Sequence, residues 1–515
     1  MLPSVDASLV VLLPVPTTIH PTVMTDRGST STEKQLELTP VVPSRPLVVD
    51  LDFTVLATDI TYESIILALK SDPLIAFRMP FWYAEGKVAF KNNLVRLGAI
   101  PEATNLPLNA SVMEFILTQK QGGRRVILAT ASHETPARAV ALHLGVFDDV
   151  IATSDGPNVG GDNKVTAIRA LIGEEEFDYI GDRNADIPIW NASHEALAVN
   201  PTASLEKSFG RPFDKVFHEP RPSLRDFLRL IRVHQWLKNV LLFLPLILAH
   251  KVGDLSKIAE CALAFAAFSL CASGVYVIND ILDLESDRAH PRKRKRPFAS
   301  GVIPVQTGLI LTPALFLVSG LIASAISPAF FAALTLYVLF TSMYTLSLKR
   351  IPLVDVFVLA GLYAYRVWCG AIAVEVPISA WMLAFSMFMF LSLAFVKRSS
   401  ELGTLRKSNG TETKGRGYSV HDADAVRSMG VTSGYMAVLV MALYINSADV
   451  RGLYLHPERL WFVVPLILYW ISRVWLIAGR GEMRDDPVIF ALEDRTSYVV
   501  AAGVAAVILL STISW

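Results

Sequence analysis

The chain has 515 residues, of which 52% are hydrophobic and 18% charged, and its 47 basic and 47 acidic residues give a formal net charge of zero. This composition is too apolar for an ordinary soluble enzyme and too charged for a protein that lies entirely in a membrane, so we expect a soluble part joined to a membrane part. With no net charge and no basic domain rich in aromatic residues, nucleic-acid binding is disfavoured.

The first 45 residues predict a disordered leader. They contain a short apolar run, but no Lys or Arg precedes it and prolines interrupt it, so it lacks the basic start of a secretory signal. The rest of this segment is rich in Ser, Thr and Pro. We assign it no function.

Residues 46–215 predict a soluble α/β domain with a parallel sheet. Short apolar strands at LVVDLDFT, RRVILATAS and FDYIGDRNAD are separated by segments of helix length. Catalytic and ligand-binding residues of such sheets lie at the carboxyl ends of the strands. This sequence places acidic and hydroxyl side chains there. These candidates are Asp50, Asp52, Thr130, Asp182 and Asp186, with Lys164 between the later two strands. A carboxylate can attack phosphorus when Mg²⁺ neutralises the anion and a second carboxyl group protonates the leaving oxygen.

DLDFT, the Thr of ILATAS, Lys164 and GDRNAD resemble, in order, the four motifs of the haloacid dehalogenase-like phosphatases. The resemblance implies Asp50 as nucleophile, Asp52 as general acid and base, and Thr130 and Lys164 as phosphate-binding residues. It also implies a Mg²⁺ site. The segment between the first two motifs is long enough for a small helical cap. The implied metal-site residues are Asp50, Asp52, Asp182 and Asp186. The alternative is an inactive fold retained as a regulator.

Residues 231–515 predict an all-α membrane domain, entered through a linker and amphipathic segment at residues 216–230. About nine apolar spans are centred near residues 242, 268, 314, 338, 362, 388, 437, 469 and 505, and each approaches the roughly 20 residues that cross a bilayer. Positive charge concentrates in alternate loops. With a cytoplasmic amino terminus, the basic loops and the soluble domain lie on the cytoplasmic face, as the positive-inside rule requires.

The NDxxDxxxD pattern of Asn279, Asp280, Asp283 and Asp287 lies where apolar chain gives way to water. Its helical spacing predicts that the oxygen-bearing side chains converge, and Mg²⁺ with a diphosphate satisfies such a cluster. The basic run from Arg292 to Arg296 follows. The alternative is a solvated acidic helix end before a positive-inside loop.

Further polar residues lie in or beside the apolar spans, where they are costly and often functional. Substrate binding and buried pairing both remain open for the deeper ones, Asp355, Arg366 and Arg473. The candidates for binding substrate are Lys238, Asn239, Tyr344, Lys349, Arg366, Lys397 and Arg398.

Residues 225–515 resemble the UbiA superfamily of membrane prenyltransferases in span number, HQWLKN, NDxxDxxxD and the LK…D loop. The family commonly has a second, DxxxD metal motif; here Asp355 is followed four residues later by Leu359. NDxxDxxxDRAHPxKxxRPxAxG, YxxxLK, LYAYR and KRxxEL are closer to the decaprenyl-phosphate phosphoribosyltransferase branch. Its members transfer phosphoribosyl from phosphoribosyl diphosphate to a polyprenyl phosphate. The resemblance implies Mg²⁺ at the NDxxDxxxD residues, with Asp355 as a further candidate ligand.

Together the two resemblances imply a bifunctional, multi-pass enzyme of a bacterial inner membrane whose phosphatase domain removes the 5-phosphate. Its product would be a precursor of arabinose donors for cell-wall arabinan or for arabinosylated nodulation factor. One alternative is an aromatic prenyltransferase that uses a prenyl diphosphate and carries an accessory phosphatase. An alternative from another class is a membrane scaffold or lipid transporter.

Overall fold

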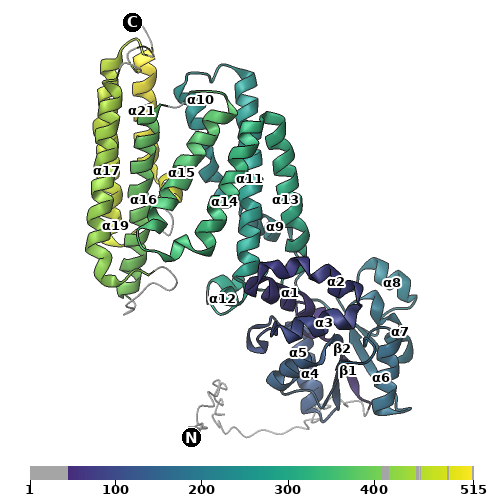
Figure 1. Ribbon diagram of the computed structural model, residues 1–515. Helices are drawn as coiled ribbons and strands as arrows, with labels where there is room; N and C mark the ends of the chain where they lie inside the picture. Colours follow the sequence, from purple (N-terminus) through teal and green to yellow (C-terminus); the bar gives the residue numbers. More distant parts are fainter. Residues whose placement is uncertain are drawn as a thin grey trace, which may run out of the picture. The chain divides into compact units, whose positions relative to one another are not determined.

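The structure is a computed structural model that describes residues 45–377, 379–407, 417–447, 450, 452, 454–483 and 487–512 (Figure 1). The predicted leader, apart from Arg45, lies outside the described residues. We call residues 45–217 the sheet domain and residues 224–512 the helical region.

The sheet domain contains six parallel strands in the order β3-β2-β1-β4-β5-β6. β1 is buried on both faces because helices cover the sheet on each side, and its Leu47, Val48 and Val49 have no exposed surface. The α/β fold class predicted from the sequence is confirmed. The strands are β1 (Leu47–Val49), β2 (Val126–His133), β3 (Asp149–Thr153), β4 (Asp178–Gly181), β5 (Ala196–Val199) and β6 (Lys215–Phe217).

A helical cap follows the turn after β1, as the length of this segment predicts. It comprises α1 (Ile60–Ser71), η2 (Pro73–Phe77), α2 (Met79–Ala84) and α3 (Lys87–Arg96). Asp59 caps α1, because its carboxylate accepts hydrogen bonds from the amides of Thr61 and Tyr62. The other elements of the domain are η1 (Leu51–Val55), η3 (Ala103–Asn105), α4 (Ala110–Gln121), α5 (Glu134–Leu144), α6 (Asp162–Ile172), η4 (Asn184–Asp186), α7 (Ile187–Ala192) and α8 (Ala203–Phe209).

The described part of the helical region has eight helices long and apolar enough to cross a bilayer, or nine if one bent pair counts as a span. The bent pair is α9 (Leu224–Leu230) with η5 (Val233–Phe243) and α10 (Leu244–Leu248); it bends by 54° where Arg232 has a φ of +52°. This pair contains the predicted first span. The eight helices are α11 (Leu255–Leu282), α13 (Val305–Ile326), α14 (Pro328–Leu346), α15 (Val354–Ala373), α16 (Ala380–Lys407), α17 (Ala423–Ile445), α19 (Val463–Arg480) and α21 (Arg495–Thr512).

Short elements connect these helices and carry several candidate residues. The short elements are α12 (Leu284–Arg288), η6 (Lys293–Lys295), η7 (Leu348–Arg350), η8 (Val420–Asp422), η9 (Pro457–Phe462) and α20 (Pro487–Glu493).

The helices pack closely at Gly370 of α15. An added Cβ there would lie 2.1 Å from the Leu242 carbonyl oxygen, so only glycine allows η5 to approach α15 this closely.

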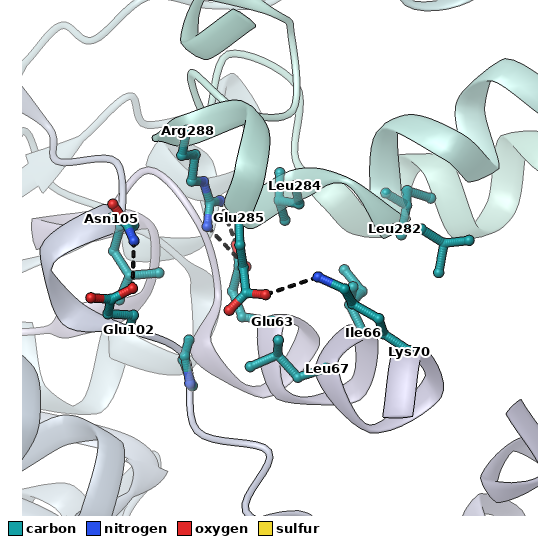
Figure 2. Close-up of a pocket in the computed structure, with 13 residues that line it drawn as sticks. Glu63, Ile66, Leu67, Lys70, Glu102, Asn105, Leu282, Leu284, Glu285 and Arg288 are labelled. Atoms are coloured by element: carbon teal, nitrogen blue, oxygen red, sulfur yellow. Dashed lines mark hydrogen bonds and ion pairs between the residues drawn. The ribbon is translucent and has the colours of Figure 1, made fainter. Parts of the chain in front are cut away.

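The cap helix α1 packs against the helical region. Ile66 belongs to a buried cluster with Val277, Ile281 and Phe298. Figure 2 shows the small crevice beside this contact, about 10 Å³ in volume, which has room for roughly one water molecule. At its edge, the Arg288 guanidinium donates hydrogen bonds of 2.7 and 3.0 Å to the Glu63 carboxylate.

Candidate functional site

The first candidate site lies at the carboxyl end of β1. Asp50 follows the strand directly, and the chain then turns through η1, where Phe53 has a φ of +58°. Glycine adopts this left-handed conformation most easily, so Phe53 holds a strained backbone position at this turn. The turn directs Asp52 toward β2. There its carboxylate accepts hydrogen bonds from the Ser132 hydroxyl at 2.6 Å and the Ile60 amide at 2.8 Å.

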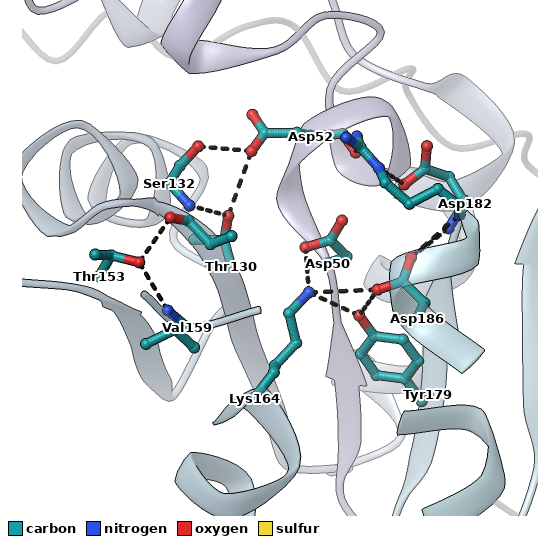
Figure 3. A network of polar contacts seen from close by, with 12 residues as sticks. Asp50, Asp52, Thr130, Ser132, Thr153, Val159, Lys164, Tyr179, Asp182 and Asp186 are labelled. Atoms are coloured by element: carbon teal, nitrogen blue, oxygen red, sulfur yellow. Dashed lines mark hydrogen bonds and ion pairs between the residues drawn. The ribbon is translucent and has the colours of Figure 1, made fainter. Parts of the chain in front are cut away.

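Lys164 joins the ends of three chain segments, as Figure 3 shows. Its ammonium lies 2.8 Å from Asp50 Oδ1, 2.9 Å from the Tyr179 hydroxyl and 3.4 Å from Asp186 Oδ1. The Tyr179 hydroxyl donates to Asp186 Oδ1 at 2.6 Å. One buried cation is thus shared between β1, β4 and the η4 turn. This ammonium is in position to hold an anion that approaches Asp50.

Asp50, Asp182 and Asp186 form a candidate metal site. They each offer one oxygen, and these oxygens all lie within 4.8 Å of one another. Three carboxylate oxygens suit a hard cation such as Mg²⁺. Gly181 makes the cradle possible, because an added Cβ would lie 2.8 Å from the Asp186 carboxylate. Asp52 is outside this group.

Burial and crowding change how these acids ionise. Burial raises the pKa of Asp50 to about 6, although the neighbouring Lys164 charge acts in the opposite direction. Burial also raises the pKa of Asp52 to about 6, with a further contribution from Asp59. Burial raises the pKa of Asp182 well above its usual range, against the effect of Arg183. A bound cation would favour the charged forms of Asp50 and Asp182, which supports the fit of these residues to Mg²⁺.

The site opens into a cleft of about 660 Å³ between the sheet and the cap. Two cleft residues are not among those predicted from the sequence: Lys91 lies outside the motifs, and Ser132 is the last residue of ILATAS. Lys91 of the cap donates to the Ala131 carbonyl oxygen at 2.6 Å and to Asn158 Oδ1 at 2.7 Å. Ser132 lines the cleft, whereas the predicted Thr130 is fully buried and accepts a hydrogen bond from the Ser132 amide. A search for polar residues two positions beyond the motif threonine would have found Ser132.

The second candidate site lies where α11 ends, at the NDxxDxxxD residues. Asp283 is the C-cap of α11 and the N-cap of α12, while Asn279 lies one turn earlier and is partly buried. Asp280 accepts hydrogen bonds from Arg232 and from Arg296, the latter at 3.1 Å. No motif indicated a role for Arg232, which approaches from the bend before η5.

Asp287 carries the feature that best fits a cation at this second site. Its Oδ2 accepts a hydrogen bond of 2.5 Å from Arg296. Its Oδ1 is buried and, within the described residues, accepts no hydrogen bond; the Lys293 ammonium lies 3.7 Å away. A buried carboxylate oxygen without a hydrogen bond is costly, so a bound cation would relieve it. The oxygen donors of this motif therefore fit Mg²⁺.

Two predicted binding residues lie beside one aromatic ring, and a third is hydrogen-bonded to one of them. The Arg366 guanidinium and the Lys238 ammonium lie 5.3 and 5.8 Å from the centre of the Tyr363 ring. Arg366 is buried and donates to Asn239 Oδ1 at 2.9 Å and to the Tyr337 hydroxyl at 3.1 Å. Among the described residues, no carboxylate pairs with Arg366. This buried positive charge with neutral partners is a candidate anion site.

Asp355, which was also a candidate metal ligand, belongs to a separate buried network. Its carboxylate accepts from Arg398 Nε at 2.6 Å and from the Tyr418 hydroxyl at 2.5 Å. Arg398 also pairs with Glu401 and interacts with Tyr344. Asp355 is thus in a buried pair, whereas Arg473 is in a partly buried pair with Asp494 at 2.7 Å.

The last two candidates, Lys349 and Lys397, lie in η7 and α16. Lys349 is in η7, between α14 and α15, and Lys397 is in α16 immediately before Arg398. Both side chains are partly buried. Lys397 interacts with other described groups.

Comparison with known proteins divides the chain in the same way. The haloacid dehalogenase-like hydrolase model matches residues 47–190, and the UbiA prenyltransferase family model matches residues 240–492. The uncharacterised protein y4nM of Sinorhizobium fredii is 32% identical over 90% of this chain and 91% of its own length. This similarity extends over both regions.

Two relatives have names that state a role. The nodulation protein NoeC of Azorhizobium caulinodans is 37% identical, over 53% of this chain and 89% of that protein. Decaprenyl-phosphate phosphoribosyltransferase of Mycobacterium tuberculosis is 28% identical, over 56% of this chain and 94% of that protein.

Proposed function

Because the chain belongs to the UbiA prenyltransferase family and carries a haloacid dehalogenase-like domain at its N-terminus, we propose that it makes polyprenylphosphoryl ribose in two steps. The helical region transfers phosphoribosyl from phosphoribosyl diphosphate to a polyprenyl phosphate, and the sheet domain removes the 5-phosphate. The similarity to decaprenyl-phosphate phosphoribosyltransferase is the observation that carries the first step. The chain is an integral, multi-pass membrane protein, because it belongs to the UbiA family and its described residues contain eight or nine apolar helices.

In the first step the lipid phosphate is the nucleophile. Arg366, Lys238 and Asn239 hold it, since a buried guanidinium with neutral partners and a nearby ammonium favour an anion. Its oxygen bonds to C1 of the ribose as the C1–diphosphate bond breaks. Mg²⁺ held by Asn279, Asp280, Asp283 and Asp287 would offset the charge of the departing diphosphate. Lys349 and Lys397 contribute positive charge for the 5-phosphate.

In the second step Asp50 attacks the phosphorus of the 5-phosphate. The bond from phosphorus to the ribose 5-oxygen breaks, and Asp52 gives its proton to that oxygen. The raised pKa of Asp52 supports this role, because the acid must hold a proton beforehand. Water then releases inorganic phosphate from Asp50, with Asp52 taking up a proton. Lys164 holds the phosphoryl oxygens, and Mg²⁺ at Asp50, Asp182 and Asp186 would offset their charge.

The product is a precursor of arabinose donors. The name of the relative NoeC supports a nodulation signal as the final acceptor, with cell-wall arabinan as the other candidate. We place the sheet domain on the cytoplasmic side of a bacterial inner membrane, because positive charge concentrates in the loops on its side of the helices.

The test of the first step is a transfer assay with purified protein in detergent and Mg²⁺. Labelled phosphoribosyl diphosphate with polyprenyl phosphate should give a labelled lipid, and Asp283→Asn should lower the rate at least about 100-fold by removing a charge that stabilises the transition state. Turnover of a prenyl diphosphate with an aromatic acceptor instead would contradict the proposal. Function unaffected by Asp283→Asn would indicate a scaffold or transporter.

A further inference from the structure

The cap exposes a group of large apolar side chains. Leu74 is 66% exposed, Phe77 74% and Phe81 71%. They lie within eight residues of one another, on η2 and the first turn of α2. We call these three residues the cap patch. Single exposed apolar residues are ordinary, but neighbouring aromatic side chains mark a contact surface.

The cap patch is the outer face of a packed element. Ile75 between its members is buried, and Met79 and Trp82 pack inward against the small core of the cap, which includes Phe90 and Leu94. Asp72 caps the start of η2 by accepting from the Leu74 amide at 2.9 Å. Because Ile75, Met79 and Trp82 occupy the inner face of this segment, Phe77 and Phe81 are left on its outer face.

The position of the cap along the chain indicates what covers this patch. Lys70, at the end of α1, pairs with Glu285 at 3.0 Å, and Glu285 follows the apolar helix α11 by only three residues. Leu74 is four residues beyond Lys70, so their Cα atoms are at most about 14 Å apart. The patch therefore begins close to the level at which α11 leaves the bilayer.

We propose that the cap patch inserts into the surface of the bilayer. Phenylalanine and leucine side chains enter the boundary between headgroups and acyl chains, and the exposed Arg78 between them can contact lipid phosphates. The same helix α2 contributes Tyr83 to the cleft over Asp50. The insertion places one wall of this cleft beside the headgroups. The inference concerns a surface and does not depend on the proposed reaction.

Spin-label accessibility in the full-length protein tests this proposal. Phe77→Cys and Phe81→Cys are labelled with a nitroxide and placed in nanodiscs of phosphatidylcholine and phosphatidylglycerol. The matched control is Leu142→Cys on α5, because Leu142 is also apolar and is 86% exposed. The three native cysteines are buried, and unsubstituted protein gives their background.

Labels at 77 and 81 should collide several-fold more often with oxygen, which concentrates in lipid, than with a water-soluble nickel chelate, and the label at 142 should show the reverse. Labels at 77 and 81 that behave as the label at 142 does would overturn the proposal. Labels shielded from both reagents, or broadened by a nearby second label, would overturn it in favour of a protein partner or a second copy.

Discussion

At the candidate metal site of the sheet domain, the oxygens of Asp50, Asp182 and Asp186 come within a few ångströms of one another in a largely buried space, and Lys164 contacts two of these carboxylates. The carboxylates repel each other, so their positions depend on the backbone that carries them. Gly181 is the tightest point of that backbone, because both the Asp186 carboxylate and the Tyr179 ring lie where a Cβ would be.

Gly181→Ala should therefore lower phosphatase activity more than about tenfold. The added Cβ displaces Asp186, and the loss of a hydrogen bond to this charged carboxylate costs about 1.5–3 kcal/mol. The measurement is phosphate release from p-nitrophenyl phosphate, and transfer by the helical region should be unchanged. Gly156→Ala is the matched control, because an added Cβ at Gly156 meets nothing within 4 Å. Equal activity of the two variants would show that Asp186 does not need its present position.

We expect a different result at Asp355, because its contacts with Arg398 and Tyr418 indicate a role in stability. Asp355→Asn leaves Arg398 without its buried carboxylate partner and should lower the free energy of unfolding by about 3 kcal/mol. The melting temperature should fall, and the Mg²⁺ concentration for half-maximal transfer should not change. Asp283→Asn should show the opposite pattern. A raised Mg²⁺ requirement in Asp355→Asn would make Asp355 a metal ligand.

The residue types, order and spacing of the four motifs predicted one site, because Asp50 and Asp182 directly follow β1 and β4 and parallel strands end at the same edge of a sheet. Lys91 reaches the same cleft from outside any motif, and nothing in ILATAS itself distinguishes Ser132 from Thr130, so the roles of Lys91 and Ser132 depended on the fold. The partner of Asp355 lies 43 residues away on another helix, and no local pattern links them. The bend at Arg232 could not be predicted either, because the sequence around Arg232 is continuous with an apolar run.

At the scale of elements, the contact between α1 and α12 links the two candidate sites. The amide of Ile60, at the start of α1, donates to Asp52, and Glu63 on the next turn accepts from Arg288. Arg288 directly follows Asp287 on α12. The Arg288 and Glu63 side chains are only 5% and 4% exposed. Both side chains of this ion pair are therefore shielded from solvent.

A double-mutant cycle tests this pair. Glu63→Ala and Arg288→Ala should each destabilise the protein by about 3 kcal/mol, because each leaves a buried charge unpaired. The double variant should be less destabilised than the sum, by at least about 1 kcal/mol. Thermal unfolding in detergent measures all three.

The exposed pair Lys70 and Glu285 is the control for this cycle. Their side chains are 44% and 40% exposed, so Lys70→Ala should cost less than about 1 kcal/mol. Additive effects of Glu63→Ala and Arg288→Ala would mean that the two charges do not interact in solution.

For the whole molecule, the proposed order of reactions explains why the two regions share a chain. The product of transfer carries the phosphate that the sheet domain would remove. Only residues 218–223 separate β6 from α9. A short connection raises the local concentration of the second site to around the millimolar range. The phosphorylated lipid should then be consumed as it forms.

The most direct test is the mass of the lipid product made from phosphoribosyl diphosphate and polyprenyl phosphate. Wild-type protein should give polyprenylphosphoryl ribose, and Asp50→Asn should give the same lipid with one additional phosphate, because transfer continues while hydrolysis stops. Identical products from the two proteins would contradict the assignment of the sheet domain. If neither protein forms a lipid that carries ribose, with or without the 5-phosphate, the proposed transfer step is wrong as well.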